Sequence, residues 1–143
     1  MLVSQILKNK PAGVVTIAPD ASLRDVVELL AARRIGAVIV SPDGAKVAGI
    51  LSERDIVREL GKRGTDCLSD AVERIMTRQI YGCAPTDLAD KVLRTMTEKR
   101  FRHMPVMEDD AMIGLISIGD VVAARLAELE YEKDALTGMI MGH

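Results

Sequence analysis

Aromatic side chains are scarce in this chain of 143 residues: they make up 2% of it, with one Phe, two Tyr and no Trp. Proteins that bind single-stranded nucleic acids stack bases on aromatic side chains, and this chain has almost none to offer. A basic stripe is missing as well, because the net charge is −2 and the lysines and arginines are interspersed with acidic residues. We therefore expect no nucleic-acid partner.

Metal ligands and catalytic groups are few. The chain has two His and two Cys, and Cys67 and Cys83 lie outside any spacing typical of a metal site. We expect no metal and interpret both cysteines as free thiols in a reducing compartment. The sequence contains no Gly-rich phosphate loop and no nucleophile with a partner base at recognisable spacing, so we expect no enzyme activity.

Long apolar runs are also missing. None approaches the roughly 18 residues that a membrane span needs, and the first residues lack the basic-then-apolar layout of a secretory signal. Hydrophobic residues make up 48% and charged residues 28%, which suits an aliphatic core under a polar surface. The sequence predicts a cytoplasmic protein with no membrane contact.

The chain repeats itself. The segment GILSERDIV at 49–57 returns as GLISIGDVV at 114–122, an offset of 65, with four of nine residues identical and three exchanged among Ile, Leu and Val. Because further matches keep their order and spacing, each half is predicted to be one structural unit. These matches, at offsets of 65 or 66, pair 16–19 with 82–85, Leu23 with Leu88, and 34–40 with 100–106.

Each half is predicted to be a β-α-β-β-α unit, because β-branched runs alternate with apolar residues at helical spacing. A unit this small has too little core to stand alone, so two are expected to pack together. In the first half the predicted strands are 14–17, 36–40 and 47–51, and the predicted helices begin at Ser22 (or Asp20) and at Ser52.

Two helices are predicted outside this pattern. The segment 68–76 can link the halves, and one long helix is expected from Asp120 to about Ile140. The long helix carries a heptad-like apolar seam that Lys133 interrupts, and this seam either covers its own core or contacts a second copy. The seam consists of Val122, Leu126, Leu129, Leu136 and Ile140.

The repeated pattern resembles the CBS family. A Pro, a helix, GAVIV at 36–40 and GILSERD at 49–55 are similar to one CBS repeat, and RHMPV at 102–106 with GLISIGD at 114–120 is similar to another. The doubled motif covers roughly residues 5–125. Among members of the family, the chain is most similar to small bacterial proteins made of one CBS pair and short terminal helices.

This resemblance implies a mixed α/β (α+β) fold of two tandem β-α-β-β-α repeats, packed with pseudo-twofold symmetry, plus a long C-terminal helix. The expected order along the chain is CBS repeat 1 at 5–62, a linking helix at 63–76, CBS repeat 2 at 77–125 and the C-terminal helix at 126–143.

The resemblance also implies a ligand, because CBS pairs bind adenine nucleotides in clefts between their two repeats. The Asp of the S-x-x-D motif binds the ribose, its Ser lies near the phosphate, and the start of the middle strand contacts the base and, through basic residues, the phosphate. The matching ribose and Ser positions are Asp55, Asp120, Ser52 and Ser117. The matching strand positions are Ile35, Gly36, Ala37 and Val38 in the first half and Arg102, His103, Met104 and Pro105 in the second. Arg54 is either a further phosphate contact or an ordinary exposed residue of its helix. The expected ligand is AMP, ADP or ATP, and NAD can use the same clefts.

Elementary chemistry is consistent with these roles. A carboxylate accepts hydrogen bonds from both ribose hydroxyls, and a helix N-terminus attracts an anion. The same S-x-x-D spacing is also that of a capping box, which stabilises a helix without any ligand. Since Arg102 and His103 stand where the first half has Gly36 and Ala37, we expect the second-half site to be the stronger one.

The sequence therefore predicts a non-catalytic regulatory module that binds adenine nucleotides. The alternative is a dimerisation or scaffold module without such a ligand. We expect a homodimer, because both terminal segments are apolar, and an output through an unidentified effector protein. The apolar terminal residues are Val3, Ile6, Leu7, Leu129, Leu136, Met139 and Ile140.

Overall fold

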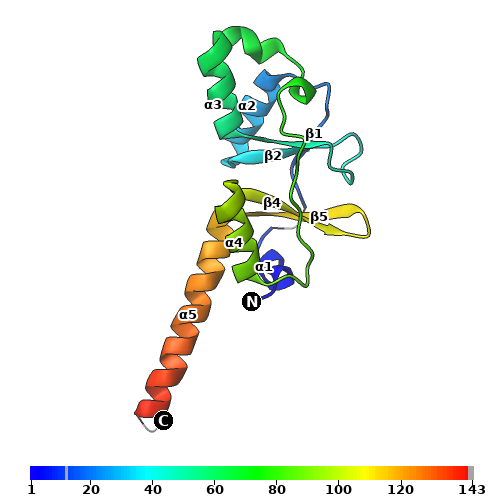
Figure 1. Cartoon of the computed structure of the whole chain (residues 1–143). Coiled ribbons are helices and arrows are strands. Elements are labelled where there is room, and N and C mark those ends of the chain that lie inside the picture. The colour runs from blue at the N-terminus through cyan, green and yellow to red at the C-terminus, as the bar shows by residue number, and fades with distance from the viewer. Residues whose placement is uncertain (12, 142–143) are drawn as a thin grey trace. The chain divides into compact units, whose positions relative to one another are not determined.

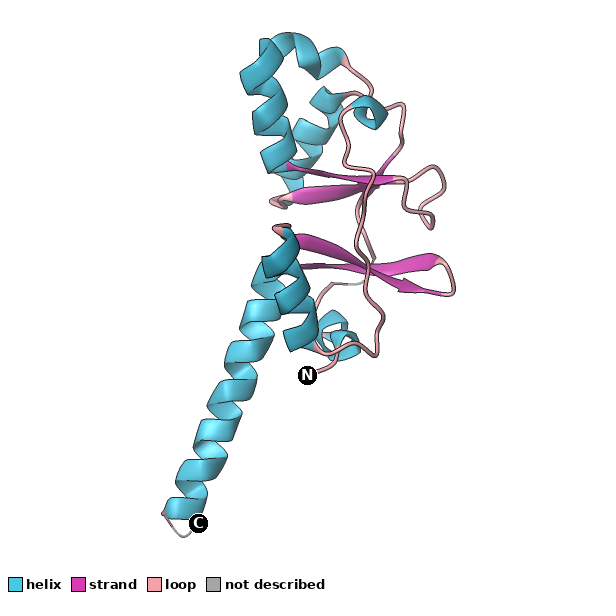
Figure 2. Ribbon diagram, viewed as in Figure 1, coloured by secondary structure: helices cyan, strands magenta, loops and turns pink. Residues whose placement is uncertain are grey.

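The computed structural model describes residues 1–11 and 13–141 as a mixed α+β protein. The chain divides into two compact units (Figure 1). Among the described residues, the first-repeat unit contains 13–81 and 109–113, and the second-repeat unit contains 1–11, 82–108 and 114–141. Figure 2 shows helices beside short strands in each of them.

The first-repeat unit is built on a three-stranded sheet in the order β1-β2-β3. β1 runs parallel to β2, and β2 runs antiparallel to β3, as the predicted β-α-β-β-α order requires. Its elements are β1 (Thr16–Ile17), α2 (Leu23–Arg33), β2 (Ala37–Val40), β3 (Gly49–Ser52) and α3 (Glu53–Arg63).

The core of this unit forms where α2 covers the sheet. Leu23, Val26 and Leu30 recur at helical spacing and are buried, together with all four residues of β2. Ser22 is the N-cap of α2, and its hydroxyl accepts a hydrogen bond from the amide of Asp25 at 3.2 Å. Of the two capping residues predicted, Ser22 rather than Asp20 takes the role.

Residues 64–76, which follow α3, form no α-helix, so the predicted linking helix is wrong. The chain instead makes two short 3-10 turns, Gly64–Ser69 and Val72–Arg74. Between them the backbone is extended and pairs with the start of α2: the amide of Leu23 donates to the carbonyl of Asp70 at 2.9 Å, and the amide of Val72 to that of Ala21 at 2.9 Å. This pairing interrupts the helix that the local sequence favours.

The second-repeat unit repeats the plan. Cys83 bridges to Val106 in parallel, as Ile17 pairs with Val40, which is the same register at an offset of 66. The strands β4 and β5 form a two-stranded sheet. The elements are α1 (Val3–Lys8), α4 (Ala89–Lys99), β4 (His103–Glu108), β5 (Ala111–Ser117, of which 111–113 belong to the first-repeat unit) and α5 (Ile118–Ile140).

The pairing of Leu23 with Leu88 is wrong by one residue. Both Ser22 and Leu88 are N-caps, so the buried Ala89 is the counterpart of Leu23 at an offset of 66. Leu88 itself is exposed. Leu23 and Leu88 are the same residue type, but they occupy different positions relative to the starts of their helices.

The N-terminal segment belongs to the second-repeat unit. The amides of Val3 and Ser4 donate to the carbonyls of Asp87 and Pro85, both at 2.9 Å, much as Val72 and the residue after it bond the loop before α2. Val3 and Ile6 are buried, so the N-terminal apolar residues do not form the exposed dimer surface that the sequence suggested. The compact units therefore do not follow the order of the chain.

Candidate functional site

Both S-x-x-D motifs lie where a strand passes into a helix. The hydroxyl of Ser52 accepts from the amide of Asp55 at 3.3 Å, and the Asp55 carboxylate accepts from the amide of Ser52 at 2.9 Å. Ser117 and Asp120 make the same two bonds at 3.1 and 2.8 Å. Both motifs are therefore capping boxes, which fixes each aspartate at the first turn of its helix.

The start of the middle strand lies beside the motif of its own repeat. The carbonyl of Gly36 accepts from the amide of Glu53 at 2.9 Å, and the carbonyl of Arg102 accepts from the amide of Ile118 at 2.7 Å. Ala37 is also the register partner of Ser52. Each unit thus brings together the strand start, the Ser and the Asp that the sequence assigned to one repeat.

Not all of the expected strand residues expose their side chains. Ala37, Val38, Met104 and Pro105 are buried, and Val38 is part of the hydrophobic core of its unit. The expected strand residues that keep accessible surface are Ile35, Gly36 and His103, which are half-buried, and Arg102, which is exposed. At the strand starts, accessible surface is therefore confined to four of the expected positions.

Lys10 distinguishes the second motif from the first. Its ammonium lies 2.7 Å from Oδ2 of Asp120 and donates to the carbonyl of Leu115, also at 2.7 Å. Partial burial raises the pKa of the Asp120 carboxyl, but the hydrogen bonds from Lys10 and Ser117 and the charge of Lys10 outweigh it and hold that pKa below its usual value. Lys10 was not predicted as a site residue, because no local sequence pattern indicates that residues 110 positions apart will be in contact.

Asp55 has a weaker cationic partner. Its Oδ1 lies 3.5 Å from Arg58 of the same helix, whose side chain is 60% exposed. Arg54, the other expected phosphate contact, is exposed and borders a shallow depression on α3 together with Glu53, Val57 and Arg58. The two carboxylates therefore share one backbone geometry in different electrostatic surroundings.

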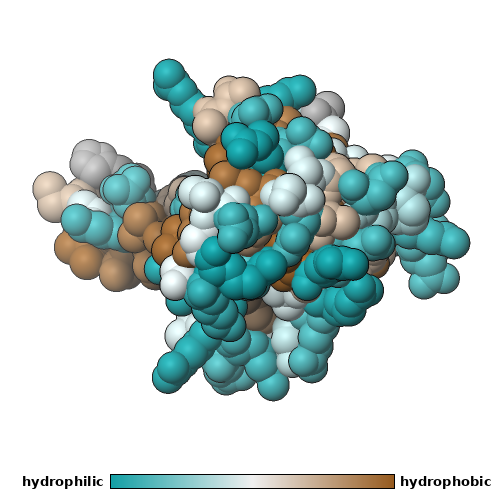
Figure 3. All heavy atoms as spheres, turned by 90° about the horizontal axis from the view of Figure 1, so that it is seen from above, coloured by the Kyte–Doolittle hydropathy of each residue, from teal (hydrophilic) through white to brown (hydrophobic). Residues whose placement is uncertain are grey.

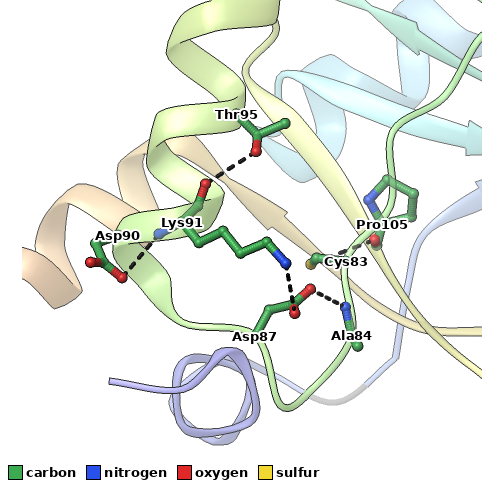
Figure 4. A network of polar contacts seen from close by, with 7 residues as sticks. All are labelled: Cys83, Ala84, Asp87, Asp90, Lys91, Thr95 and Pro105. Atoms are coloured by element: carbon green, nitrogen blue, oxygen red, sulfur yellow. Dashed lines mark hydrogen bonds and ion pairs between the residues drawn. The ribbon is translucent and has the colours of Figure 1, made fainter.

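Cys67 and Cys83 are both buried, and both have free thiols. Figure 4 shows Cys83 directed at the carbonyl of Pro105, 3.8 Å from its Sγ, beside Asp87 and Lys91. Burial, and secondarily the charge of Asp87, raises the pKa of the Cys83 thiol to about 12 against a smaller opposing effect of Lys91. This thiol stays protonated at neutral pH and is a poor nucleophile.

Across residues 1–11 and 13–141, no group of three or more His, Cys, Asp or Glu side chains is placed to hold a metal ion. The same residues include no helix that is both long and apolar enough to cross a membrane.

Comparison with known proteins shows what this arrangement resembles. The CBS domain family matches residues 3–62 and 72–127. The mitochondrial CBS domain-containing protein CBSX3 of Arabidopsis thaliana is 32% identical over 98% of this chain and 72% of its own length.

Solved structures share the fold. The CBS-domain containing protein ATU1752 from Agrobacterium tumefaciens is 39% identical, with a TM-score of 0.84 over 87% of this chain and 99% of that one. The CBS domain protein PAE2072 from Pyrobaculum aerophilum, complexed with AMP, is 25% identical, with a TM-score of 0.74 over 84% and 89% of the two chains.

Proposed function

The chain belongs to the CBS domain family, and we propose that it is a non-catalytic regulatory module that binds an adenine nucleotide at each of its two S-x-x-D motifs. The observation that carries this proposal is the duplicated geometry, in which a strand start, a capping Ser and a fixed Asp meet in both units. The AMP complex of the PAE2072 protein supports the ligand class. We expect AMP, ADP or ATP, with NAD as a further ligand.

The second motif offers a nucleotide the larger set of partners. Asp120 is fixed to accept hydrogen bonds from ribose hydroxyls, and Arg102 and His103 begin the adjacent strand with groups suited to phosphate. In the first turn of α5 the amides of Ile118 and Asp120 are used within the protein. Gly119 between them contributes a further amide at the positive end of the helix dipole.

The test is to measure nucleotide affinity in three matched variants. Asp25, Asp55 and Asp120 each end an S-x-x-D capping box, but the box of Ser22 and Asp25 lacks the Gly three residues before the Ser that marks the repeated motifs at 49–55 and 114–120. Loss of a charge-assisted hydrogen bond costs about 1.5–3 kcal/mol, so we expect Asp120→Ala to weaken binding roughly ten- to hundredfold. We expect a smaller loss in Asp55→Ala and none in Asp25→Ala.

Thermal unfolding with AMP, ADP, ATP and NAD selects the ligand. A nucleotide at 100 times its dissociation constant should stabilise the protein by about 2.7 kcal/mol. If none of the four raises the midpoint, the adenine-nucleotide proposal is wrong and the scaffold alternative is favoured. Equal losses in Asp25→Ala and Asp120→Ala would reduce the motif to a helix cap.

The regulatory role also needs a route from the site to an output. We propose a homodimer, whose arrangement responds to the nucleotide or is recognised by an effector protein. The exposed apolar surface of α5 supports this proposal. Light scattering of the intact chain tests it, because a mass near the 15.5 kDa of one chain at micromolar concentration would contradict a dimer.

A further inference from the structure

Helix α5 carries an apolar seam with the spacing of a coiled coil. Five hydrophobic residues and Lys133 follow one another along α5 at alternating intervals of four and three residues. In heptad notation, Val122 is the first d position and Leu126 is the first a position, and the d and a positions then alternate to Ile140. The seam consists of Val122, Leu129 and Leu136 at d and Leu126, Lys133 and Ile140 at a.

The seam is not buried by the part of the chain that the structure describes. Its five hydrophobic side chains are between 38% and 76% exposed, whereas Val121 and Ala124 of the same helix are buried. Val121 and Ala124 occupy c and f positions, on the opposite side of the helix from a and d, and α5 packs against α4 and α1. The face that α5 uses for its own unit is therefore distinct from the seam.

The distal half of α5 packs against no other element among residues 1–11 and 13–141. Figure 1 shows the helix extending beyond the rest of its unit, and Figure 3 shows apolar surface on the arm that ends at the C-terminus. From Leu126 to Ile140 every residue is exposed or half-exposed. Most of the stability of a helix in a protein comes from the packing of its apolar face, so a second surface on the seam would stabilise these turns.

We propose that this surface is α5 of a second copy of the chain, and that the two helices form a parallel two-stranded coiled coil. This inference rests on the homodimer of the proposed function and specifies its contact. A helix with a single seam is complementary to itself, and a polar Lys at one a position is typical of seams that set register and limit the assembly to two strands.

The charges that flank the seam select the parallel direction. Arg125, which pairs with Glu128 of its own helix at 2.7 Å, is at a g position and would also face Glu130, at an e position, of the second copy when the helices run parallel. Glu132, at g, then lies beside Lys133 across the interface. In the antiparallel arrangement that aligns the seam, Glu130 of one chain would lie opposite Glu130 of the other, and Glu132 opposite Glu132. That arrangement places like charges together.

The experiment compares two Lys substitutions of equal charge in the full chain. Leu136 lies on the seam and Tyr131, 77% exposed, lies on the opposite side of the same helix. By sedimentation velocity we expect at least tenfold weaker dimerisation in Leu136→Lys and no change in Tyr131→Lys. We expect tighter dimerisation in Lys133→Leu, because the buried ammonium is removed.

Cysteine cross-linking tests the direction. Both native cysteines are buried, so Leu136→Cys introduces the accessible thiol. Under mild oxidation this thiol should form a disulfide with the same position of the second copy, while that of Tyr131→Cys should not. Cross-linking only between a Leu126→Cys chain and a Leu136→Cys chain would overturn the parallel direction.

Failure of this inference differs from failure of the proposed function. A Leu136→Lys chain that remains as dimeric as the wild type overturns the seam but leaves the homodimer standing. A wild-type chain that is monomeric at all concentrations overturns both. Nucleotide affinity measured in Leu136→Lys reports separately on the ligand site, which does not include the seam.

Discussion

Lys10 makes Asp120 chemically different from Asp55, although the two aspartates occupy the same position of the same motif. The Lys10 ammonium contacts the Asp120 carboxylate at 2.7 Å, whereas Asp55 has an exposed arginine at 3.5 Å. An ion pair of this kind, partly shielded from water, both orients a carboxylate and ties the N-terminal segment to the start of α5.

The Lys10 pair predicts a pH dependence. The folded-state pKa of Asp120 lies below its unfolded value near 3.8, so the pair contributes stability above that pH and loses it as the pH falls through the folded pKa. We expect Lys10→Met to lower the free energy of unfolding by about 1 kcal/mol at pH 7 and to flatten its fall below pH 4. Urea unfolding between pH 7 and pH 3 measures both, with Lys8→Met as the exposed control.

Two glycines predict opposite stability changes. A Cβ at Gly49 would overlap the side chain of the buried Met76, whose Cγ would lie 2.7 Å away, so Gly49→Ala should cost about 1–3 kcal/mol. A Cβ at Gly61, inside α3, meets nothing within 4 Å, and Gly61→Ala should stabilise by roughly 0.5–1 kcal/mol. Denaturant unfolding decides both signs. A near-additive loss in Gly49→Ala combined with Met76→Ala would contradict the overlap.

At the scale of elements, the two halves differ in how their first helices begin. α2 starts with a Ser whose hydroxyl and paired Asp form a capping box, while the N-cap of α4 is Leu88, which makes no side-chain cap hydrogen bond. The amide of Lys91, which corresponds to that of Asp25 in α2, instead donates to Oδ1 of the adjacent Asp90 at 3.0 Å.

This difference predicts a stabilising substitution. The backbone of Leu88 is already extended, as an N-cap requires, and its side chain is half exposed, so little packing is lost on truncation. A Ser hydroxyl at this position would replace Asp90 as the acceptor of the Lys91 amide, so Leu88→Ser should raise the free energy of unfolding by only about 0.5 kcal/mol, whereas Ser22→Ala should lower it by about 1 kcal/mol. Thermal or urea unfolding tests the pair, and a destabilised Leu88→Ser would mean that Leu88 packs more than its exposure indicates.

At the scale of the whole molecule, the units and the sequence repeats have different boundaries. The segment from Val3 to Lys8 stands to the second-repeat unit as the segment around Val72 stands to the first. Val3 and Val72 are both fully buried and both donate their amides to the loop before a helix.

This arrangement predicts where two equivalent mutations act. Truncating a fully buried Val costs about 2–3 kcal/mol, so Val3→Ala and Val72→Ala should destabilise the protein by similar amounts. We expect Val3→Ala to increase hydrogen exchange in α4, far along the chain, and Val72→Ala to increase it in α2. Increased exchange confined to α2 in Val3→Ala would show that the N-terminal segment packs elsewhere.

The sequence alone determined the repeat, the alternation of strands and helices, and the residues of both motifs. These features are local: apolar spacing, a capping Ser three residues before an Asp, and turn residues at the ends of strands act within a few positions of the chain. That is why the strand-to-helix turns at Ser52 and Ser117 could be predicted together with their capping bonds.

Only the tertiary structure decided what depends on contacts between distant segments. It replaced the linking helix by 3-10 turns, because residues 70–72 pair with the start of α2. It buried Val3 and Ile6 in the unit of the other repeat, and it brought Lys10 to Asp120. Such contacts join segments tens to more than a hundred residues apart, and no local pattern of residue types carries the information on which of them will meet.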